Sequence, residues 1–132
     1  ALFNMNFLTN NLMEYHQTQI RVRYSETDQM RVVYHGNYAQ YFEIGRVEWL
    51  RNKGISYKWM EENGIMLPVV SLTMNYKKSA RYDELLTLKT ILKNRTTVKI
   101  EFDYELYNES EELLTTGSSI LVFVEAILML FL

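Results

Sequence analysis

Asp28 and His35 are two ionisable side chains of types that enzymes use, and they lie seven residues apart. They fall in the segment YSETDQMRVVYHGNY, residues 24–38, which joins an expected strand to an expected helix. A carboxylate can act as a nucleophile or as a general base. The start of a helix presents backbone N–H groups that suit a developing oxyanion. The spacing therefore predicts a site in which Asp28 faces the helix start near His35.

The same residues also have a structural interpretation. Residues 25–28 are Ser, Glu, Thr and Asp, the types that loops use for capping and turns. His35 could be satisfied by backbone groups, and Tyr24 and Tyr34 could be packing residues with solvated hydroxyls. Taken singly, the residue types favour this structural interpretation.

Several other chemistries are excluded by inspection. The sequence has no GxGxxG, GxxxxGK[ST], GxSxG or HExxH motif. It has no cysteine, which removes disulfides, thiolate metal sites and cysteine nucleophiles. The only histidines, His16 and His35, belong to no close-spaced ligand pair, so we expect no metal site. A net charge of −2 lacks the basic excess of a nucleic-acid-binding protein.

A strand and a long helix are expected to position the candidate site. Apolar residues alternate at Ile20, Val22 and Tyr24, which predicts a half-buried strand. A helical period over residues 37–53 predicts an amphipathic helix that Gly54 ends. Its predicted apolar face holds Tyr38, Tyr41, Phe42, Trp49 and Leu50, and its predicted solvent side holds Arg46, Glu48 and Arg51.

The rest of the chain predicts a second short helix and four strands. Ser56 can cap a helix over residues 57–63, which Gly64 stops. Strands are expected at residues 70–77, 86–92, 98–106 and 113–124, with turns at 94–96 and 108–112. The first of these places Val70, Leu72, Met74 and Tyr76 on one apolar face. This order predicts one α+β domain over residues 1–132, with an antiparallel sheet of about five strands around a central helix.

Residues 22–50, VRYSETDQMRVVYHGNYAQYFEIGRVEWL, closely resemble the 4-hydroxybenzoyl-CoA thioesterase family in its small bacterial acyl-CoA thioesterase branch. The positions that match its signature are Tyr24, Thr27, Asp28, Val33, Tyr34, His35, Asn37, Tyr38, Glu43 and Arg46. The resemblance spans about residues 19–124 and implies a hotdog fold, a sheet wrapped around one long helix. One departure is Arg31, where the family usually has a Gly that can adopt a positive φ.

The resemblance implies roles for individual residues. Asp28 would be the catalytic carboxylate, acting either as nucleophile or as general base on an acyl-CoA thioester. The carbonyl would be polarised by backbone N–H groups near His35, and the side chains of His35 and Tyr24 would shape and orient the site. Tyr34 would contact the substrate. Coenzyme A is part of that substrate, and no separate cofactor is expected.

A basic cluster could contact the phosphates of coenzyme A. Lys77, Lys78 and Arg81 form the densest group of cations in the chain, at an expected strand end. A solvated strand end is the alternative interpretation. The resemblance also implies a homodimer or homotetramer with its sites at the subunit interface.

Other functions stay open. A thioesterase for acyl carrier protein would need a surface for an acidic partner, which Arg46, Arg51, Lys53, Lys77 and Lys78 could supply. A non-catalytic acyl-CoA binder in which Arg31 blocks the loop is a third possibility, and a hydratase or a general interaction module is less favoured. The lack of a basic N-terminal signal predicts a cytoplasmic protein with no membrane span. Residues 1–15 and the apolar residues 126–132 are atypical ends.

Overall fold

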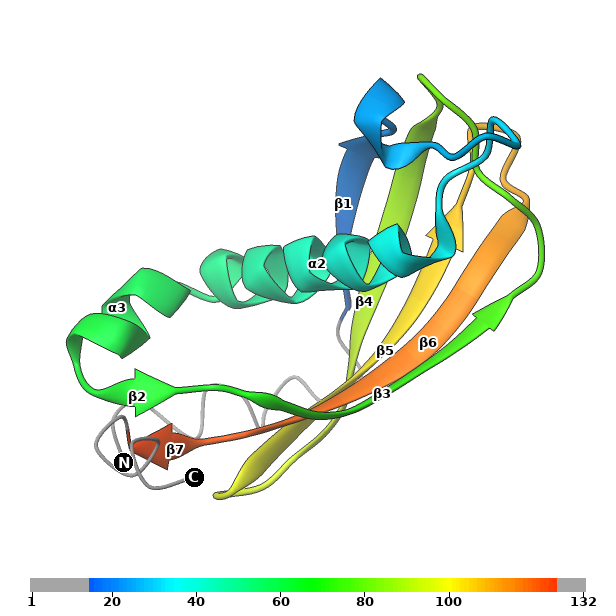
Figure 1. The fold of residues 1–132 in the computed structure, drawn as a ribbon. Helices are drawn as coiled ribbons and strands as arrows, with labels where there is room; N and C mark the ends of the chain where they lie inside the picture. The colour runs from blue at the N-terminus through cyan, green and yellow to red at the C-terminus, as the bar shows by residue number, and fades with distance from the viewer. Residues whose placement is uncertain (1–14, 126–132) are drawn as a thin grey trace.

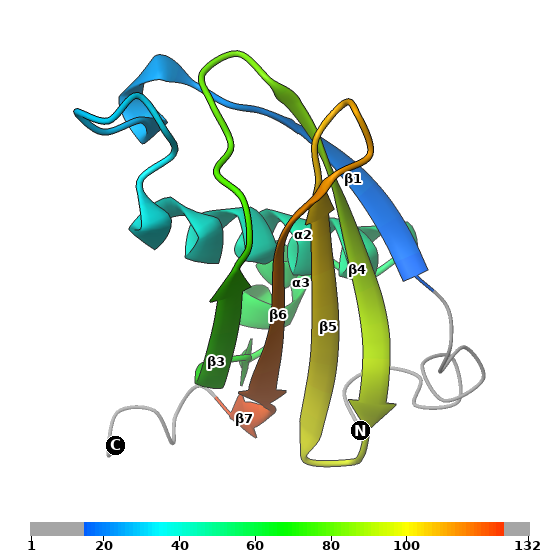
Figure 2. The same ribbon diagram turned by 90° about the vertical axis from the view of Figure 1, so that its right-hand side faces the viewer.

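Five long antiparallel strands form the main sheet of the computed structural model, which describes residues 15–125 (Figure 1). The order across this sheet is β1-β4-β5-β6-β3, as Figure 2 shows from its outer face. The strand bounds are β1 Tyr15–Arg21, β3 Val69–Tyr76, β4 Leu85–Arg95, β5 Lys99–Tyr107 and β6 Leu113–Val122. A small second sheet pairs β2 (Ile65–Met66) with β7 (Val124–Glu125).

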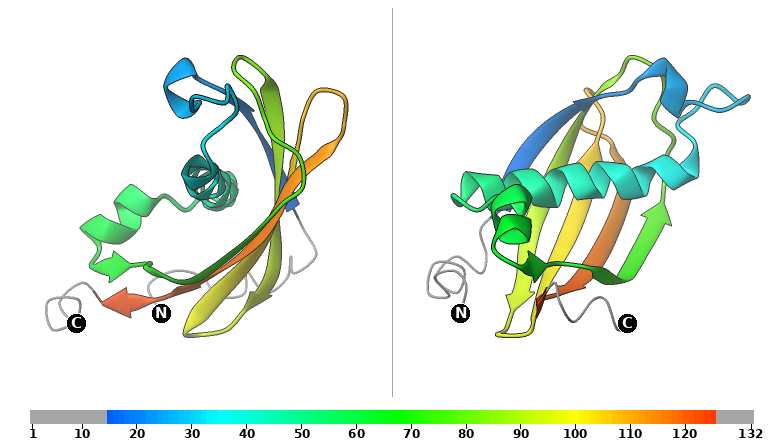
Figure 3. Two further views of the ribbon diagram at one scale, coloured as in Figure 1. Left: turned by 45° about the vertical axis from the view of Figure 1, so that its right-hand side comes forward. Right: turned by 60° about the vertical axis from the view of Figure 1, so that its left-hand side comes forward.

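Helix α2 (Tyr38–Asn52) lies across the concave face of the main sheet, which curves around it (Figure 3). The shorter α3 (Tyr57–Glu62) follows it and leads into β2. Two 3-10 turns, η1 (Tyr24–Glu26) and η2 (His35–Asn37), precede α2. This arrangement confirms the predicted α+β class and hotdog fold.

Alternation along the strands buries one face of the sheet against α2. In β5, the side chains from Ile100 to Leu106 alternate between buried and half-buried positions. Phe42 of α2 stacks on Tyr104 with ring centroids 4.3 Å apart, and Trp49 meets Phe102 edge-on at 5.3 Å. Gly117 of β6 allows this close packing, because a Cβ there would lie 2.4 Å from the Phe42 ring.

The predicted helix ends are confirmed. Gly54 and Gly64 follow the two helices with φ values of +83° and +78°, and the Ser56 side chain accepts a hydrogen bond from the Trp59 N–H. Three strand boundaries were wrong. The last strand, expected over residues 113–124, ends at Val122, and Val124 belongs to β7 of the second sheet. The first strand ends at Arg21. β4 continues through Arg95, because the turn forms later, where Thr96 N–H donates to the Lys99 carbonyl.

The predicted solvent position of Arg46 was also wrong. Arg46 is 7% exposed, because it lies one helical turn from both Phe42 and Trp49 on the face that the sheet covers. Burial alone would lower the pKa of Arg46, but the Tyr104 and Tyr57 hydroxyls beside it raise that pKa above its ordinary value.

Strand β3 forms one edge of the main sheet and keeps much of its apolar surface exposed. Leu72 and Tyr76 are 40% and 53% exposed, although they point to the same side of the sheet as α2. A register shift between Val69 and Ser71 leaves Val70 without a partner on β6, so this residue departs from the predicted alternation.

The expectations for residues 1–14 and 126–132 lie outside the described residues. Among residues 15–125, no helix is both long enough and apolar enough to cross a membrane. The cytoplasmic location and the single-domain organisation remain predictions from the sequence.

Candidate active site

Asp28 opens a tight hairpin loop that projects from the body of the molecule. Its N–H donates to the Val32 carbonyl, and its own carbonyl accepts from the Arg31 N–H, both at 2.9 Å. One carboxylate oxygen, Oδ1, accepts from the Met30 N–H at 2.8 Å. The loop therefore fixes the backbone of Asp28 and engages one of its two carboxylate oxygens.

Arg31 adopts the left-handed conformation at the end of this loop, with a φ of +66°. A three-residue hairpin loop commonly combines a type I turn with one left-handed residue, usually Gly. The structure thus retains the backbone conformation that a family Gly would adopt, and the Arg31 side chain is exposed.

The start of the helix lies close to this loop. The first helical hydrogen bond runs from the Asn37 N–H to the Tyr34 carbonyl at 2.9 Å. The N–H groups of His35 and Gly36 therefore precede the helical hydrogen-bond pattern, as the first N–H groups of a helix do. Together with the positive end of the helix dipole, these donors favour negative charge at this point.

A pocket of about 570 Å³ brings these parts together. Asp28 and His35 both line it, as the sequence predicts, and Lys77 and Lys78 line it from the end of β3. The remaining lining residues are Val32, Val33, Tyr38, Tyr76 and Ser79.

Three of the residues predicted for the site do not line this pocket. Tyr34 lies beside it, with its ring centroid 4.4 Å from that of His35. Tyr24 is 76% exposed and meets the ring of Tyr82 edge-on. Arg81 is exposed, and its backbone forms an isolated bridge with Val32.

Tyr38, Tyr76 and Ser79 line the pocket but were missed as site residues. The Tyr76 hydroxyl donates to the His35 carbonyl at 3.3 Å, and the Tyr38 hydroxyl accepts from the Ala80 N–H at 3.2 Å. Burial raises the pKa of Tyr38 above its ordinary value. One signal was available, because Tyr76 directly precedes the two lysines already selected.

The two pocket lysines differ in their surroundings. Lys78 forms an exposed ion pair with Glu112, and hydrogen bonds from Lys78 and Asn108 lower the pKa of that carboxyl. Lys77 has no carboxylate within ion-pair distance among residues 15–125. Lys77 is thus the more available cation. Over the same part of the chain, no group of three His, Cys, Asp or Glu residues is placed to hold a metal ion.

Comparison with known proteins identifies the family. A family model described as the thioesterase superfamily matches residues 30–115. The chain belongs to the thioesterase superfamily. This superfamily member is 36% identical over 107 residues to a putative acyl-CoA thioesterase, YneP, of Bacillus subtilis (strain 168), covering 81% of this chain and 78% of the relative. It is 28% identical over 110 residues to the acyl-CoA thioester hydrolase YbgC of Escherichia coli O157:H7. This match covers 83% of this chain and 82% of the relative.

Solved structures of other proteins agree with the fold. A DHNA-CoA thioesterase from Staphylococcus aureus superposes with a TM-score of 0.83 at 44% identity, covering 85% of this chain and 75% of that chain. A 4-hydroxybenzoyl CoA thioesterase in complex with 4-hydroxybenzoyl CoA superposes with a TM-score of 0.75 at 20% identity, covering 83% of each chain. At this identity the similarity shows the fold alone.

Proposed function

We propose that this chain is an acyl-CoA thioesterase that hydrolyses a thioester to a free acid and coenzyme A. The observation that carries the proposal is the pocket shared by the Asp28 carboxylate and the helix start at His35, in a member of the thioesterase superfamily. The names of its relatives support the same chemistry. We also propose membership of the narrower 4-hydroxybenzoyl-CoA thioesterase family, on the motif of residues 22–50.

The reaction can be written with Asp28 as a general base. Its carboxylate takes a proton from water as the water oxygen bonds to the thioester carbon. The N–H groups of His35 and Gly36 stabilise the resulting oxyanion, and loss of one such donor typically costs about 10²–10³-fold in rate. The carbon–sulfur bond then breaks, and the departing thiolate of coenzyme A receives the proton.

A nucleophilic route uses the same carboxylate. Asp28 attacks the thioester carbon directly, which releases the thiolate and leaves a mixed anhydride on the enzyme. Water then hydrolyses this anhydride and regenerates the carboxylate. Both routes need one free carboxylate oxygen and the same oxyanion donors.

We further propose that the functional unit contains at least two copies of the chain, paired along the exposed edge strand β3. Tyr76 ends this strand and lines the pocket, and Lys77 and Lys78 follow it directly. A second copy at this edge would therefore complete the walls of the pocket. We also propose an orienting role for Tyr24, which is 76% exposed and lies outside the pocket of a single copy.

The surface expected for an acyl carrier protein is smaller in the structure than the sequence suggested. Arg46 is buried, and Arg51 is paired with Glu48. Free acyl-CoA is therefore the favoured substrate.

The test is thiol release from a panel of short, long, branched and aromatic acyl-CoAs, including 1,4-dihydroxy-2-naphthoyl-CoA. Asp28→Asn should lower turnover by about 10³-fold or more, since it removes the base or nucleophile. Asp83→Asn, the same change in an exposed turn outside the pocket, is the matched control and should retain the wild-type rate.

If Asp28→Asn hydrolysed every responsive thioester at the wild-type rate, the proposed role of Asp28 would be refuted. If the folded wild-type protein turned over none of the panel, a carrier-protein substrate or a binding function would replace acyl-CoA hydrolysis.

A further inference from the structure

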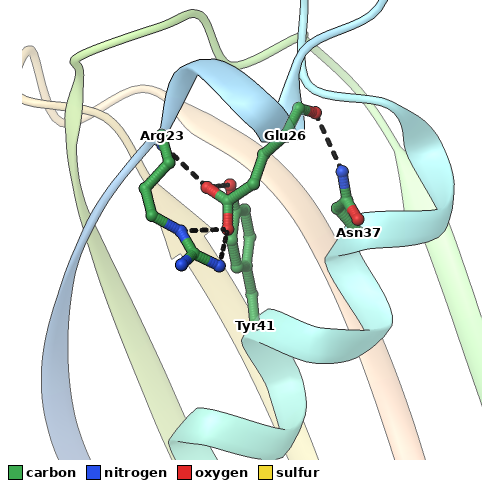
Figure 4. A network of polar contacts seen from close by, with 4 residues as sticks. All are labelled: Arg23, Glu26, Asn37 and Tyr41. Carbon is green, nitrogen blue, oxygen red and sulfur yellow. Dashed lines mark hydrogen bonds and ion pairs between the residues drawn. The ribbon is translucent and has the colours of Figure 1, made fainter.

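We propose that Glu26 is a positioning residue that holds the Asp28 loop against the start of helix α2. The proposal rests on the function proposed above and concerns four residues, Arg23, Glu26, Asn37 and Tyr41, here called the Glu26 network (Figure 4). Sequence reasoning assigned Glu26 only to turn formation. The structure places it between the loop and the helix.

The Glu26 side chain is buried and hydrogen bonded on both sides. Its Oε1 accepts from the Arg23 N–H at 2.8 Å and from the Tyr41 hydroxyl at 2.9 Å. Tyr41 lies on the first turn of α2 and is 0% exposed. Burial, followed by the hydrogen bond to Glu26, raises the pKa of Tyr41 far above its ordinary value, so its hydroxyl remains a donor.

The backbone of Glu26 makes a second set of contacts with the helix start. Its carbonyl accepts from the Tyr34 N–H at 2.9 Å and from the Asn37 side-chain amide at 2.8 Å. Asn37 is the N-cap residue of α2, where an Asn side chain normally accepts from the helix itself. It makes no such cap bond here. Its side chain instead ties the helix start to the loop.

A short and well-bonded connection joins Glu26 to Asp28. Only Thr27 lies between them, and both its N–H and its hydroxyl donate to the Tyr24 carbonyl, at 3.1 and 2.7 Å. Thr27 also forms a bridge with Val33, just before the helix start. A displacement of Glu26 is therefore transmitted to Asp28, and a shift of about 1 Å in a catalytic group can cost about 10²-fold in rate.

Stability alone gives a poor explanation for this carboxylate. The Glu26 side chain is 9% exposed, whereas its cationic partner Arg23 is 73% exposed. An ion pair open to solvent on one side contributes little, and removing a carboxylate from water is costly. An apolar residue would fill the same space, but it could not accept from Arg23 and Tyr41 together.

The experiment compares Glu26→Ala, Glu26→Gln and Tyr41→Phe with the wild type in acyl-CoA hydrolysis. Glu26→Ala should lower kcat by about 10²-fold with little change in KM, because Lys77 and Lys78 lie on a different element. Glu26→Gln should stay within about threefold, because its amide oxygen still accepts from the Arg23 N–H and the Tyr41 hydroxyl. It loses only the contacts of the solvent-exposed Arg23 guanidinium with Oε2, which are long at 3.3 Å. Tyr41→Phe should lose about tenfold.

Tyr104→Phe is the matched control. It also removes one buried tyrosine hydroxyl, which is 2.5 Å from Ser119 at the centre of the sheet, away from the pocket. It should lower the melting temperature at least as much as Tyr41→Phe, because its hydroxyl also lies beside the buried Arg46, while leaving kcat unchanged. An equal loss of kcat in both variants would overturn the positioning role.

Backbone amide exchange gives a readout that does not depend on activity. The N–H groups of Asp28 and Tyr34 should exchange at least about tenfold faster in Glu26→Ala, and at the wild-type rate in Glu26→Gln and Tyr104→Phe. Unchanged exchange in Glu26→Ala would overturn the proposal even if the wild type is an active thioesterase. If Glu26→Ala exchanged faster but the wild type hydrolysed no thioester, the role of Glu26 in holding the loop would stand and the proposed function would be rejected.

Discussion

Arg31 holds a backbone conformation that disfavours its own side chain, with a φ of +66° at the end of the Asp28 loop. A residue with a Cβ at positive φ is strained, whereas Gly adopts this conformation readily. Arg31→Gly should therefore raise the free energy of unfolding by about 1 kcal/mol, measured by urea denaturation at constant m-value. Hydrolysis should persist, because the loop keeps its hydrogen bonds.

Gln29→Gly is the control for this change, since Gln29 shares the loop but has no positive φ. It should lower stability, because Gly only adds freedom to the unfolded chain there. A loss of stability in both variants would show that the left-handed conformation at Arg31 is not strained.

The pocket lysines should act on binding more than on turnover. Replacing Lys77 and Lys78 with Ala should raise KM for acyl-CoA by about tenfold with kcat nearly unchanged, because two charge-assisted contacts to phosphate are lost. Lys58→Ala, on α3 outside the pocket, is a control for loss of a surface cation. An unchanged KM in the double variant would identify this strand end as merely solvated.

Among the elements, those with a strong local period were predictable and those defined by tertiary contacts were not. The alternation in β5 and the glycines after the helices gave their positions within a few residues. Arg46 was predicted on the solvent side because it is charged, although its spacing from Phe42 and Trp49 indicates the buried face.

The residues of the candidate site likewise include some that a local motif predicts and others that only tertiary contacts bring in. The motif around Asp28 and His35 predicted the loop and the helix start, and both residues line one pocket. Tyr76 enters that pocket because β3 pairs with β6, a contact between residues about 40 positions apart that no local pattern encodes. Glu26 looked like an ordinary turn residue, since its burial depends on contact with Tyr41, 15 positions later in the chain.

Helix α2 approaches β4 closely at Gly45, and this contact is testable. An added Cβ would lie 2.4 Å from Thr90 Oγ1 and 2.5 Å from Leu88 Cδ2. Ala is favoured over Gly inside a helix by about 0.5–1 kcal/mol, but overpacking a core costs about 1–3 kcal/mol. Gly45→Ala should therefore lower the melting temperature.

The neighbouring Ile44→Ala serves as the control, because Ile44 is 40% exposed and the change should have little effect. A rise in melting temperature for Gly45→Ala would mean that the helix and the sheet separate easily at this point.

At the scale of the whole molecule, the exposed edge of the sheet predicts self-association. Val70 on β3 is 58% exposed, and Val98 in the β4–β5 turn is 63% exposed. Val70→Lys should shift the protein toward monomer in light scattering at micromolar concentration, since a charged edge strand resists pairing. Val98→Lys makes the same change away from this edge and should leave the mass unchanged. A monomeric wild type would contradict the proposed pairing.

The sheet order also has a consequence for how the chain folds. Within residues 15–125, strand β1 pairs only with β4, so Ile20 meets Leu86 after more than 60 intervening residues have been made. The Asp28 loop and the helix start lie in the segment between these two paired strands. Contacts so distant in sequence form slowly, because the entropy of closing the loop is lost before the strands pair. During synthesis, the segment that carries the candidate site therefore leaves the ribosome well before the strand that anchors it, and it becomes competent only when the first strand docks.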